Sequence, residues 1–324
     1  MIGDRLKRAR AAAGLSMKAL GEQVGVSANM IKKYEHDESM PTSPVLIRLA
    51  RALGVRSEYF FRPVRVSLNR VEYRKRASTT KAELKRIEAD VLDQAERWQE
   101  LADLWPEFPV AGFSGVEGLP ETITDYAELE RVANHVRRSW KLGLNPLPEV
   151  IDVLESKGIL VITTDVDVAG KFDGLQATVA GQPLIVVSNQ WHGDRQRFTL
   201  AHEFGHLLLE GRLSSDLDEE KACNYFASAF LLPAESAREQ IGESRHSIEV
   251  RELYMLKHEY GLSMQACLYR LKVLKIISDN LFDKLIKRFS AAGWRKQEPG
   301  DQVPQESTIP VSYTHLRAHE TRHD

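Results

Sequence analysis

The sequence has few cysteines, no long apolar run and almost no net charge, and each shortage excludes a class of protein. Cys223 and Cys267 are its only 2 cysteines and form no CxxC pair, which excludes a disulfide framework and a zinc ribbon. No stretch approaches about 18 uninterrupted apolar residues, and the N-terminus lacks the apolar core of a signal peptide. We therefore expect a soluble, cytoplasmic protein without a membrane partner.

The composition that remains is that of a globular chain, with 43% hydrophobic and 28% charged residues. Its 324 residues have room for about two or three domains. The formal net charge of −2 hides an asymmetry, because residues 1–76 carry 16 Lys+Arg and 7 Asp+Glu, a net of +9, which leaves −11 for residues 77–324. A basic segment of this kind indicates a polyanion partner such as DNA, or else a solvated charged face.

Residues 1–64, which we call the head, have the pattern of short helices broken by Gly, Ser and Pro. Gly25 follows Val24 and precedes Ser27, which predicts one helix, a tight turn, and a second helix capped by Ser27. Apolar residues recur at helical spacing throughout the segment, at Leu6, Leu20, Val24, Ile31, Leu46, Leu49 and Leu53.

Residues 65–123 are predicted to connect this head to the rest of the chain. A polar helix is expected from Lys81 to Trp105, with an apolar seam that repeats every seven residues, at Leu84, Val91, Trp98 and Trp105. The seam predicts either pairing with a second copy of the chain or packing on a neighbouring domain. Pro and Gly residues between positions 106 and 120 predict a flexible linker.

Residues 124–294, which we call the body, combine helical segments with three strand-like runs. The runs at 159–164, 175–179 and 184–188 predict strands, and helices are predicted over most of 197–292. The fold class is therefore mainly α with a small β-sheet (α+β). Residues 295–324 are polar and proline-rich, which predicts a disordered tail.

The strongest chemical signal is an HExxH motif formed by His202, Glu203 and His206 within an apolar segment. Residues four apart share one face of a helix, so both imidazoles can bind one metal, while Glu203 can take a proton from water at the metal's open position. Zinc suits this donor set best, although Mn or Fe also bind two histidines and a carboxylate. Without a metal or hydrogen-bond partners, these buried polar groups would be costly.

A third metal ligand is expected from the helix that follows. Glu220 and Asn224 lie four residues apart, so we expect Glu220 to bind the metal and Asn224 to hold a ligand imidazole in the right tautomer. Glu219 is the alternative to Glu220, displaced by about 100° around the helix and so predicted to be exposed. Cys223 is interpreted as a small buried residue rather than a thiolate ligand.

A second HExxH match runs from His319 to His323, next to the end of the sequence. No apolar residues support it and no helix follows to supply a third ligand, so we predict incidental metal binding there at most. The last 14 residues, from Val311, resemble appended non-native sequence.

Residues 125–277 resemble the ImmA/IrrE family of zincin-like metallopeptidase domains. The resemblance rests on four segments in family order, "RRSWKLGLNPLPEVIDVLESKGILVI", "RFTLAHEFGHLLLEG", "EKACNYFASAFLLP" and "YGLSMQACLYRLKVLKII". It implies that His202, His206 and Glu220 bind zinc and that Glu203 is the general base. Cys223 departs from the alanine that is usual in the family.

Residues 5–62 resemble the XRE/Cro-type helix-turn-helix, an all-α DNA-binding domain. The resemblance implies a recognition helix from Ser27 to Tyr34 that enters the major groove. The residues expected at the DNA are Ser27, Ala28, Asn29, Lys32 and Lys33. Met17 stands where the family commonly has a polar residue that contacts the DNA backbone.

Two functions follow from these resemblances. The first is a sequence-specific transcriptional regulator that binds double-stranded operator DNA as a homodimer, with a zinc-dependent endopeptidase that cleaves a repressor-type protein or its own linker, for example in a stress response. The second is a non-catalytic repressor, or the antitoxin of a toxin–antitoxin system, whose metal domain senses a ligand or binds the toxin. Glu203 favours the first, because a structural metal site needs ligands but no general base.

Overall fold

The computed structural model describes residues 2–75, 79–104, 112–166 and 172–306. The chain divides into two compact units: residues 1–108, 164–172 and 177–181 form the first, and residues 109–163, 173–176 and 182–324 form the second. The second HExxH match and the segment from Trp105 to residue 111 lie outside the described residues.

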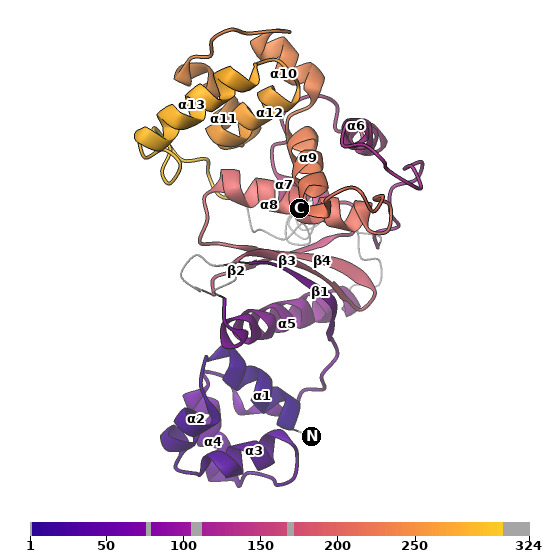
Figure 1. The fold of residues 1–324 in the computed structure, drawn as a ribbon. Coiled ribbons are helices and arrows are strands. Elements are labelled where there is room, and N and C mark those ends of the chain that lie inside the picture. The colour runs from indigo at the N-terminus through magenta and orange to yellow at the C-terminus, as the bar shows by residue number, and fades with distance from the viewer. Residues whose placement is uncertain (1, 76–78, 105–111, 167–171, 307–324) are drawn as a thin grey trace, which may run out of the picture. The chain divides into compact units, whose positions relative to one another are not determined.

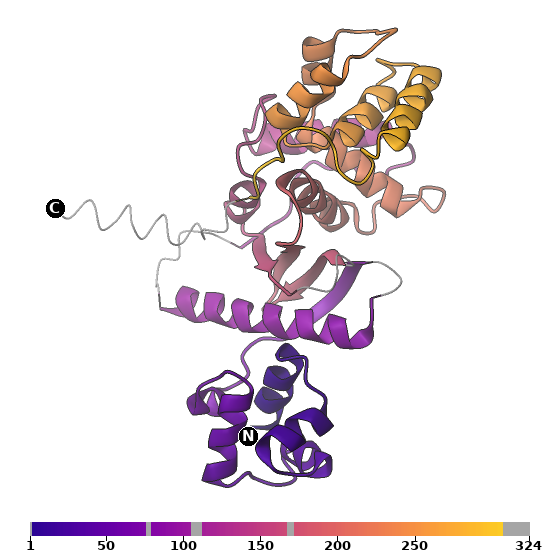
Figure 2. The same ribbon diagram turned by 90° about the vertical axis from the view of Figure 1, so that its left-hand side faces the viewer.

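The head is a bundle of short helices (Figures 1 and 2). Its elements are α1 (Gly3–Ala12), α2 (Met17–Val24), α3 (Ala28–Glu35), α4 (Ser43–Ala52) and the 3-10 helix η1 (Ser57–Phe61). They enclose one apolar core, and the residues predicted at helical spacing contribute to it, among them Leu6, Leu20, Val24, Ile31, Leu49 and Leu53. Burial of these side chains stabilises the bundle.

The predicted helix-turn-helix is confirmed between α2 and α3. Gly25 ends α2 in the left-handed conformation, with φ of 73°, and the Ser27 hydroxyl accepts a hydrogen bond from the Met30 backbone amide at 3.2 Å. Gly21 allows the turn to pass close to α2, because a Cβ at this position would lie 2.6 Å from the Val26 carbonyl oxygen.

We expect Gly21→Ala to destabilise the head by about 1–3 kcal/mol, because the added methyl group has no room beside the backbone of the turn. Urea unfolding of the full chain, followed by a probe in the head, measures this change. Glu22→Ala, an exposed change on the same helix, serves as the control, with an expected effect within about 0.5 kcal/mol. Equal stability of the two variants would contradict the prediction.

The first unit continues with the strand β1 (Leu68–Lys75) and the long helix α5 (Lys81–Asp103). A buried charge cluster joins α5 to the head, since Glu96 of α5 lies 2.5 Å from Arg5 Nη1 and 2.9 Å from Arg8 Nη1. Leu84 and Val91 of the predicted seam are buried, so this part of the seam packs within the chain.

Four strands form one sheet in the order β1-β3-β4-β2, with β2 (Leu160–Thr164), β3 (Phe172–Val179) and β4 (Gln182–Ser188) at the predicted places. A two-residue turn joins β3 to β4, and both of its residues, Ala180 and Gly181, have positive φ, as tight hairpins require. The strand β1 was not expected from the sequence. Its many basic residues suit the edge of a sheet, where β1 lies, but weaken the pattern by which strands are recognised.

Helices dominate the second unit, as predicted. They are α6 (Glu128–Ser139), α7 (Val150–Glu155), α8 (Gly193–Leu209), α9 (Glu219–Leu231), α10 (Ala234–Ile241), α11 (Val250–Tyr260), α12 (Met264–Val273) and α13 (Asp279–Ala291). The helix α8 packs against α9 and β4, and α6 packs against α9. The mainly α fold with a small sheet is confirmed. None of the helices in the described ranges has the length and apolar character needed to cross a bilayer.

Two segments expected to be flexible or disordered pack on the second unit instead. In the predicted linker, Phe113, Val116 and Leu119 pack against the apolar core. In the predicted tail, residues 298–306, which we call the strap, include the buried Val303 and Glu306, and the Val303 carbonyl accepts a hydrogen bond from Gly193 at 3.0 Å.

The prediction of disorder is therefore wrong for the strap. Its carboxylates neutralise cations buried in the unit. Glu306 lies 2.5 Å from Arg197 Nη1, and Glu298 lies 3.1 Å from Lys257 Nζ. A buried charge without a partner is costly, which explains why this polar segment is ordered.

Candidate functional site

The helix α8 carries the HExxH motif and lies close against β3. Gly174 of β3 makes this approach possible, because a Cβ there would lie 2.8 Å from Thr199 Cγ2 and 3.7 Å from Glu203 Cγ. Glu203 is 2% exposed and lies beside this strand. The glycine thus leaves room for a carboxylate between helix and sheet.

A second glycine brings α9 to the opposite side of the motif. A Cβ at Gly205 would lie 3.1 Å from Phe226 Cδ1 and 3.4 Å from Cys223 Cβ, so the two helices touch at this point. The start of α9 is fixed by Asp218, whose carboxylate accepts a hydrogen bond from the Lys221 amide at 2.8 Å. The first two turns of α9 therefore face the imidazoles of α8.

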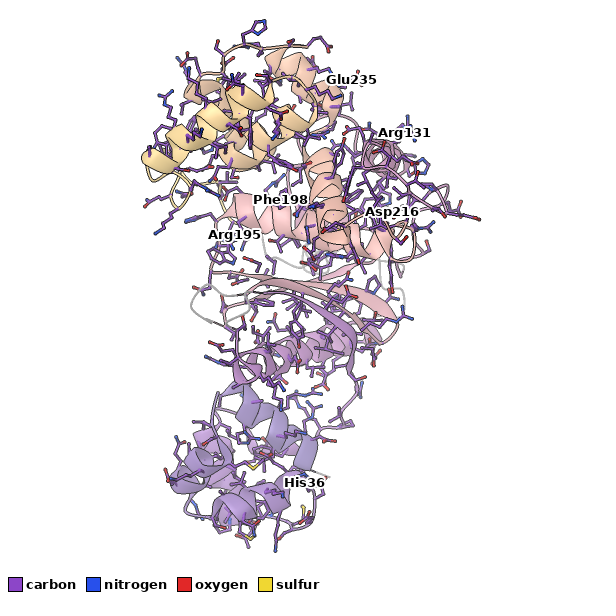
Figure 3. The ribbon with its side chains drawn as sticks, viewed as in Figure 1. His36, Arg131, Arg195, Phe198, Asp216 and Glu235 are labelled. Carbon is purple, nitrogen blue, oxygen red and sulfur yellow. The ribbon has the colours of Figure 1, made fainter. Side chains whose placement is uncertain are left out.

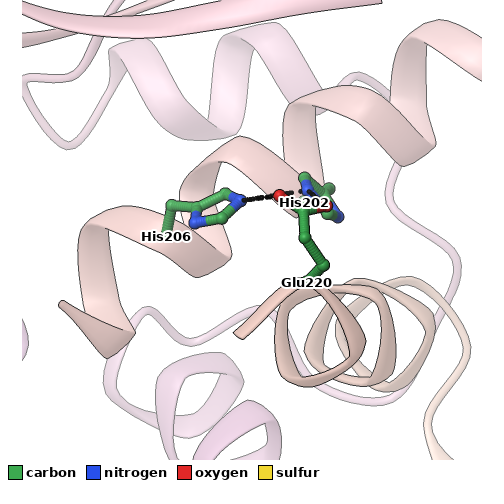
Figure 4. Close-up of side chains that lie close together, drawn as sticks. All are labelled: His202, His206 and Glu220. Carbon is green, nitrogen blue, oxygen red and sulfur yellow. Dashed lines mark hydrogen bonds and ion pairs between the residues drawn. The ribbon is translucent and has the colours of Figure 1, made fainter. Parts of the chain in front are cut away.

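Three donor groups converge between these helices: His202, His206 and Glu220 (Figure 4). The two Nε2 atoms are 3.1 Å apart, Glu220 Oε2 is 3.4 Å from His202 Nε2, and Glu220 Oε1 is 3.5 Å from His206 Nε2. Ligand atoms about 2.0–2.1 Å from a tetrahedral zinc ion are about 3.3 Å from one another. The donor set therefore fits a zinc ion in both chemistry and spacing.

The other ring nitrogens of both histidines have oxygen partners. Asn224 Oδ1 lies 3.0 Å from His202 Nδ1, and Glu219 Oε1 lies 3.0 Å from His206 Nδ1. Oxygen acceptors at Nδ1 favour the tautomer with a proton there, which leaves the Nε2 lone pair free to bind a metal.

The structure brings together His202, His206 and Glu220, with Asn224 at the outer nitrogen of His202. Glu203, the predicted general base, follows His202 on α8 and is buried.

The contact of Glu219 with His206 was not predicted. The Glu219 side chain is 55% exposed, as its place on the helix predicts, yet it reaches the outer nitrogen of His206. The only signal for this contact is its place in the first turn of α9 beside Glu220, which does not distinguish a ligand from a neighbour of a ligand.

The site is buried on one side and open on the other. His202 is fully buried and His206 is 9% exposed, whereas the Glu220 side chain is 68% exposed. Because the Glu220 carboxylate is exposed, a substrate can approach the donor cluster from the side of Glu220. Cys223 is fully buried and does not belong to the donor cluster.

In the head, α3 presents the residues predicted to meet DNA. Asn29, Lys32 and Lys33 are exposed and Ala28 is half-buried, whereas Ile31 is buried in the core. Ser27 is exposed, and its hydroxyl caps α3. The exposed face of α3 thus carries an amide and two cations, groups that suit contact with base edges and phosphates.

Comparison with known proteins identifies the class of each domain. Residues 6–60 match the family described as "Helix-turn-helix", and residues 154–272 match the family described as "IrrE N-terminal-like domain". The chain therefore contains one segment similar to a helix-turn-helix domain and one similar to an IrrE N-terminal-like domain.

Two relatives each match one of these domains. The "Radiation response metalloprotease IrrE" of Deinococcus deserti is 36% identical over 101 residues, which cover 27% of this chain and 35% of the relative. The "Uncharacterized transcriptional regulator in ATPase CF(0) region" of Rhodospirillum rubrum is 35% identical over 60 residues, which cover 18% of this chain and 56% of the relative. The chain thus spans about a third and just over half of these relatives.

The P22 c2 repressor protein, known from a crystal structure in complex with a synthetic operator, is also similar to this chain in sequence. The identity is 32%, and the match covers 18% of this chain and 91% of the repressor chain, with a TM-score of 0.18.

Proposed function

We propose that this protein is a DNA-binding transcriptional regulator whose body is a zinc-dependent endopeptidase, acting on a repressor-type protein or on its own chain. The observation that carries the proposal is the donor cluster of His202, His206 and Glu220. The buried Glu203 follows His202 on the same helix. The helix-turn-helix and metalloprotease relatives support the two halves of the proposal.

Each residue of the site has a role in this proposal. His202, His206 and Glu220 hold the metal, and Asn224 and Glu219 fix the orientation of the two imidazoles. A bound zinc ion supplies Lewis acidity, which lowers the pKa of water and polarises a carbonyl group. Glu203 takes the proton of the attacking water as general base and delivers it to the leaving amine.

The burial of Glu203 favours the peptidase over a non-catalytic repressor or antitoxin. A carboxylate with 2% exposure is costly to desolvate, and it is not a member of the donor cluster. A site that only held a metal for structure or sensing would need the metal ligands but no general base at this position.

The identity of the substrate is tested by mixing the zinc-loaded full chain with XRE-type repressors. The fragments that form are followed by mass spectrometry. Fragments of a repressor support cleavage of another protein. Fragments that end within residues 106–120 of the chain itself support self-cleavage. An intact chain under conditions that cleave a repressor excludes self-cleavage.

The head is proposed to bind double-stranded operator DNA through α3 as a homodimer, the usual arrangement for helix-turn-helix regulators. We expect Lys32→Ala combined with Lys33→Ala to weaken operator binding and to reduce the slope of log affinity against log salt by about two, because each phosphate contact releases about one counterion. Fluorescence anisotropy at several salt concentrations measures both quantities.

The matched control removes two cations from an exposed face of the body. Lys284→Ala combined with Lys287→Ala on α13 changes the net charge by the same amount. We expect this control to leave the salt slope unchanged. Equal effects of the two double variants would show that α3 has no special part in DNA binding.

A further inference from the structure

A pocket of about 440 Å³ lies in the second unit, near the N-terminal end of α8. This volume is in the range of small-molecule binding sites, about 300–1,000 Å³. None of the three residues of the donor cluster lines this pocket. Its walls come from the loop before α8, from α8, α11 and α12, and from the segment 294–302.

Aromatic side chains line the pocket: Trp191, Phe198 and Trp294. Trp191 is held by Arg195, whose guanidinium carbon lies 3.5 Å from the centre of its ring, and Arg195 is itself held by Asp173 at 2.6 Å. Figure 3 shows Arg195 and Phe198 together on the same end of α8. Fixed aromatic rings around a cavity suit a flat ring system.

The charges inside the pocket are balanced, whereas those at its edge are not. The buried Lys257 is neutralised by Glu298 at 3.1 Å, with Asp194 at 4.0 Å. Arg295 and Lys296 also line the pocket but are exposed, and their side chains form no ion pair or hydrogen bond with any residue in the described ranges. The edge of the pocket therefore attracts an anion.

Polar side chains complete the lining. The side-chain amides of Gln190, Gln297 and Gln302 make no hydrogen bond to other described residues. An amide offers both a donor and an acceptor, which is what the polar edge of a nucleobase requires. The lining thus combines flat apolar walls, amides and an anion-attracting edge.

We propose that this pocket binds a mononucleotide, with the base against the aromatic residues and the phosphate at Arg295 and Lys296. The proposal is independent of peptidase activity, because none of the pocket residues belongs to the metal centre. It gives the body a site for an effector.

The position of the pocket connects this effector to the metal centre through one helix. Phe198 lies in the pocket, and His202 follows it by one turn, about 6 Å along the axis of α8. The strap forms part of the pocket wall through Glu298 and Gln302, and then holds α8 through Val303 and Glu306. A ligand bound against this wall therefore contacts both the strap and the helix that carries His202 and His206.

Isothermal titration of the full chain with AMP, GMP, CMP and UMP tests the proposal, with adenosine and ribose 5-phosphate as the separate halves of AMP. We expect at least one nucleotide to bind about tenfold or more tightly than either half, because both the rings and the cations contribute. Arg295→Ala combined with Lys296→Ala should weaken nucleotide binding about tenfold and leave adenosine binding unchanged.

Trp191→Leu should weaken both nucleotide and adenosine binding about tenfold, because stacking on a base is lost. The control Lys284→Ala with Lys287→Ala should change neither. Three results would overturn the proposal: no binding of any nucleotide, adenosine binding as tight as AMP, or equal losses in the two double-cation variants.

Discussion

Replacing Glu203 by glutamine is expected to slow cleavage of a protein substrate by about 10²–10⁴-fold, the usual contribution of a general base. Glutamine has nearly the same shape but cannot take a proton at neutral pH. Glu203 is also not a member of the donor cluster, so the variant should still bind metal. The expected result is therefore loss of activity with retention of metal.

The measurement follows fragments of a repressor-type substrate together with the metal content of the variant. Glu210→Gln is the matched control, because Glu210 is an exposed glutamate at the C-terminal end of the same helix. This control should cleave at the wild-type rate. A Glu203→Gln variant that cleaved as fast as the control would contradict the proposed peptidase activity and favour the non-catalytic regulator.

Glu306→Ala is expected to destabilise the second unit by about 3–5 kcal/mol, because it removes the partner of a buried cation. Arg197 is 5% exposed and its Nη1 atom lies 2.5 Å from the Glu306 carboxylate. The same carboxylate accepts hydrogen bonds from the Val150 and Ile151 amides at the start of α7. One substitution therefore leaves a buried cation without its counter-charge and two buried amides without an acceptor.

Urea unfolding of the full chain measures this loss. Asp301→Ala removes an exposed carboxylate from the same strap and should cost less than about 0.5 kcal/mol. Arg197→Met combined with Glu306→Leu should recover the part of the loss that comes from the unpaired cation, because an apolar pair replaces the buried ion pair. The Val150 and Ile151 amides still lack their acceptor in this variant. Equal stability of Glu306→Ala and Asp301→Ala would show that the strap does not hold the unit.

Features set by local spacing could be predicted from the sequence. The turn at Gly25 and Ser27 and the strands at 159–164, 175–179 and 184–188 depend on neighbouring residues, and the structure has them where they were expected. The same is true of the two histidines, because residues four apart in a helix share a face whatever surrounds it.

Features set by distant partners could not be predicted. The strap is polar, and only the folded body shows that Arg197 and Lys257 are buried and need its carboxylates. Glu219 was assigned to solvent from its angle around α9, but its contact with His206 depends on how closely α8 and α9 approach at Gly205. Such contacts depend on packing between elements rather than on the sequence of one element.

The metal content of the purified chain tests the central claim most directly, because peptidase and sensor alike require a metal at this centre. The histidines outside the described residues should first be replaced, with His315, His319 and His323 changed to alanine, so that they cannot bind metal. Elemental analysis is then expected to find about one zinc per chain, and none after His202→Ala with His206→Ala. Equal zinc in both proteins, or none in either, would contradict the account.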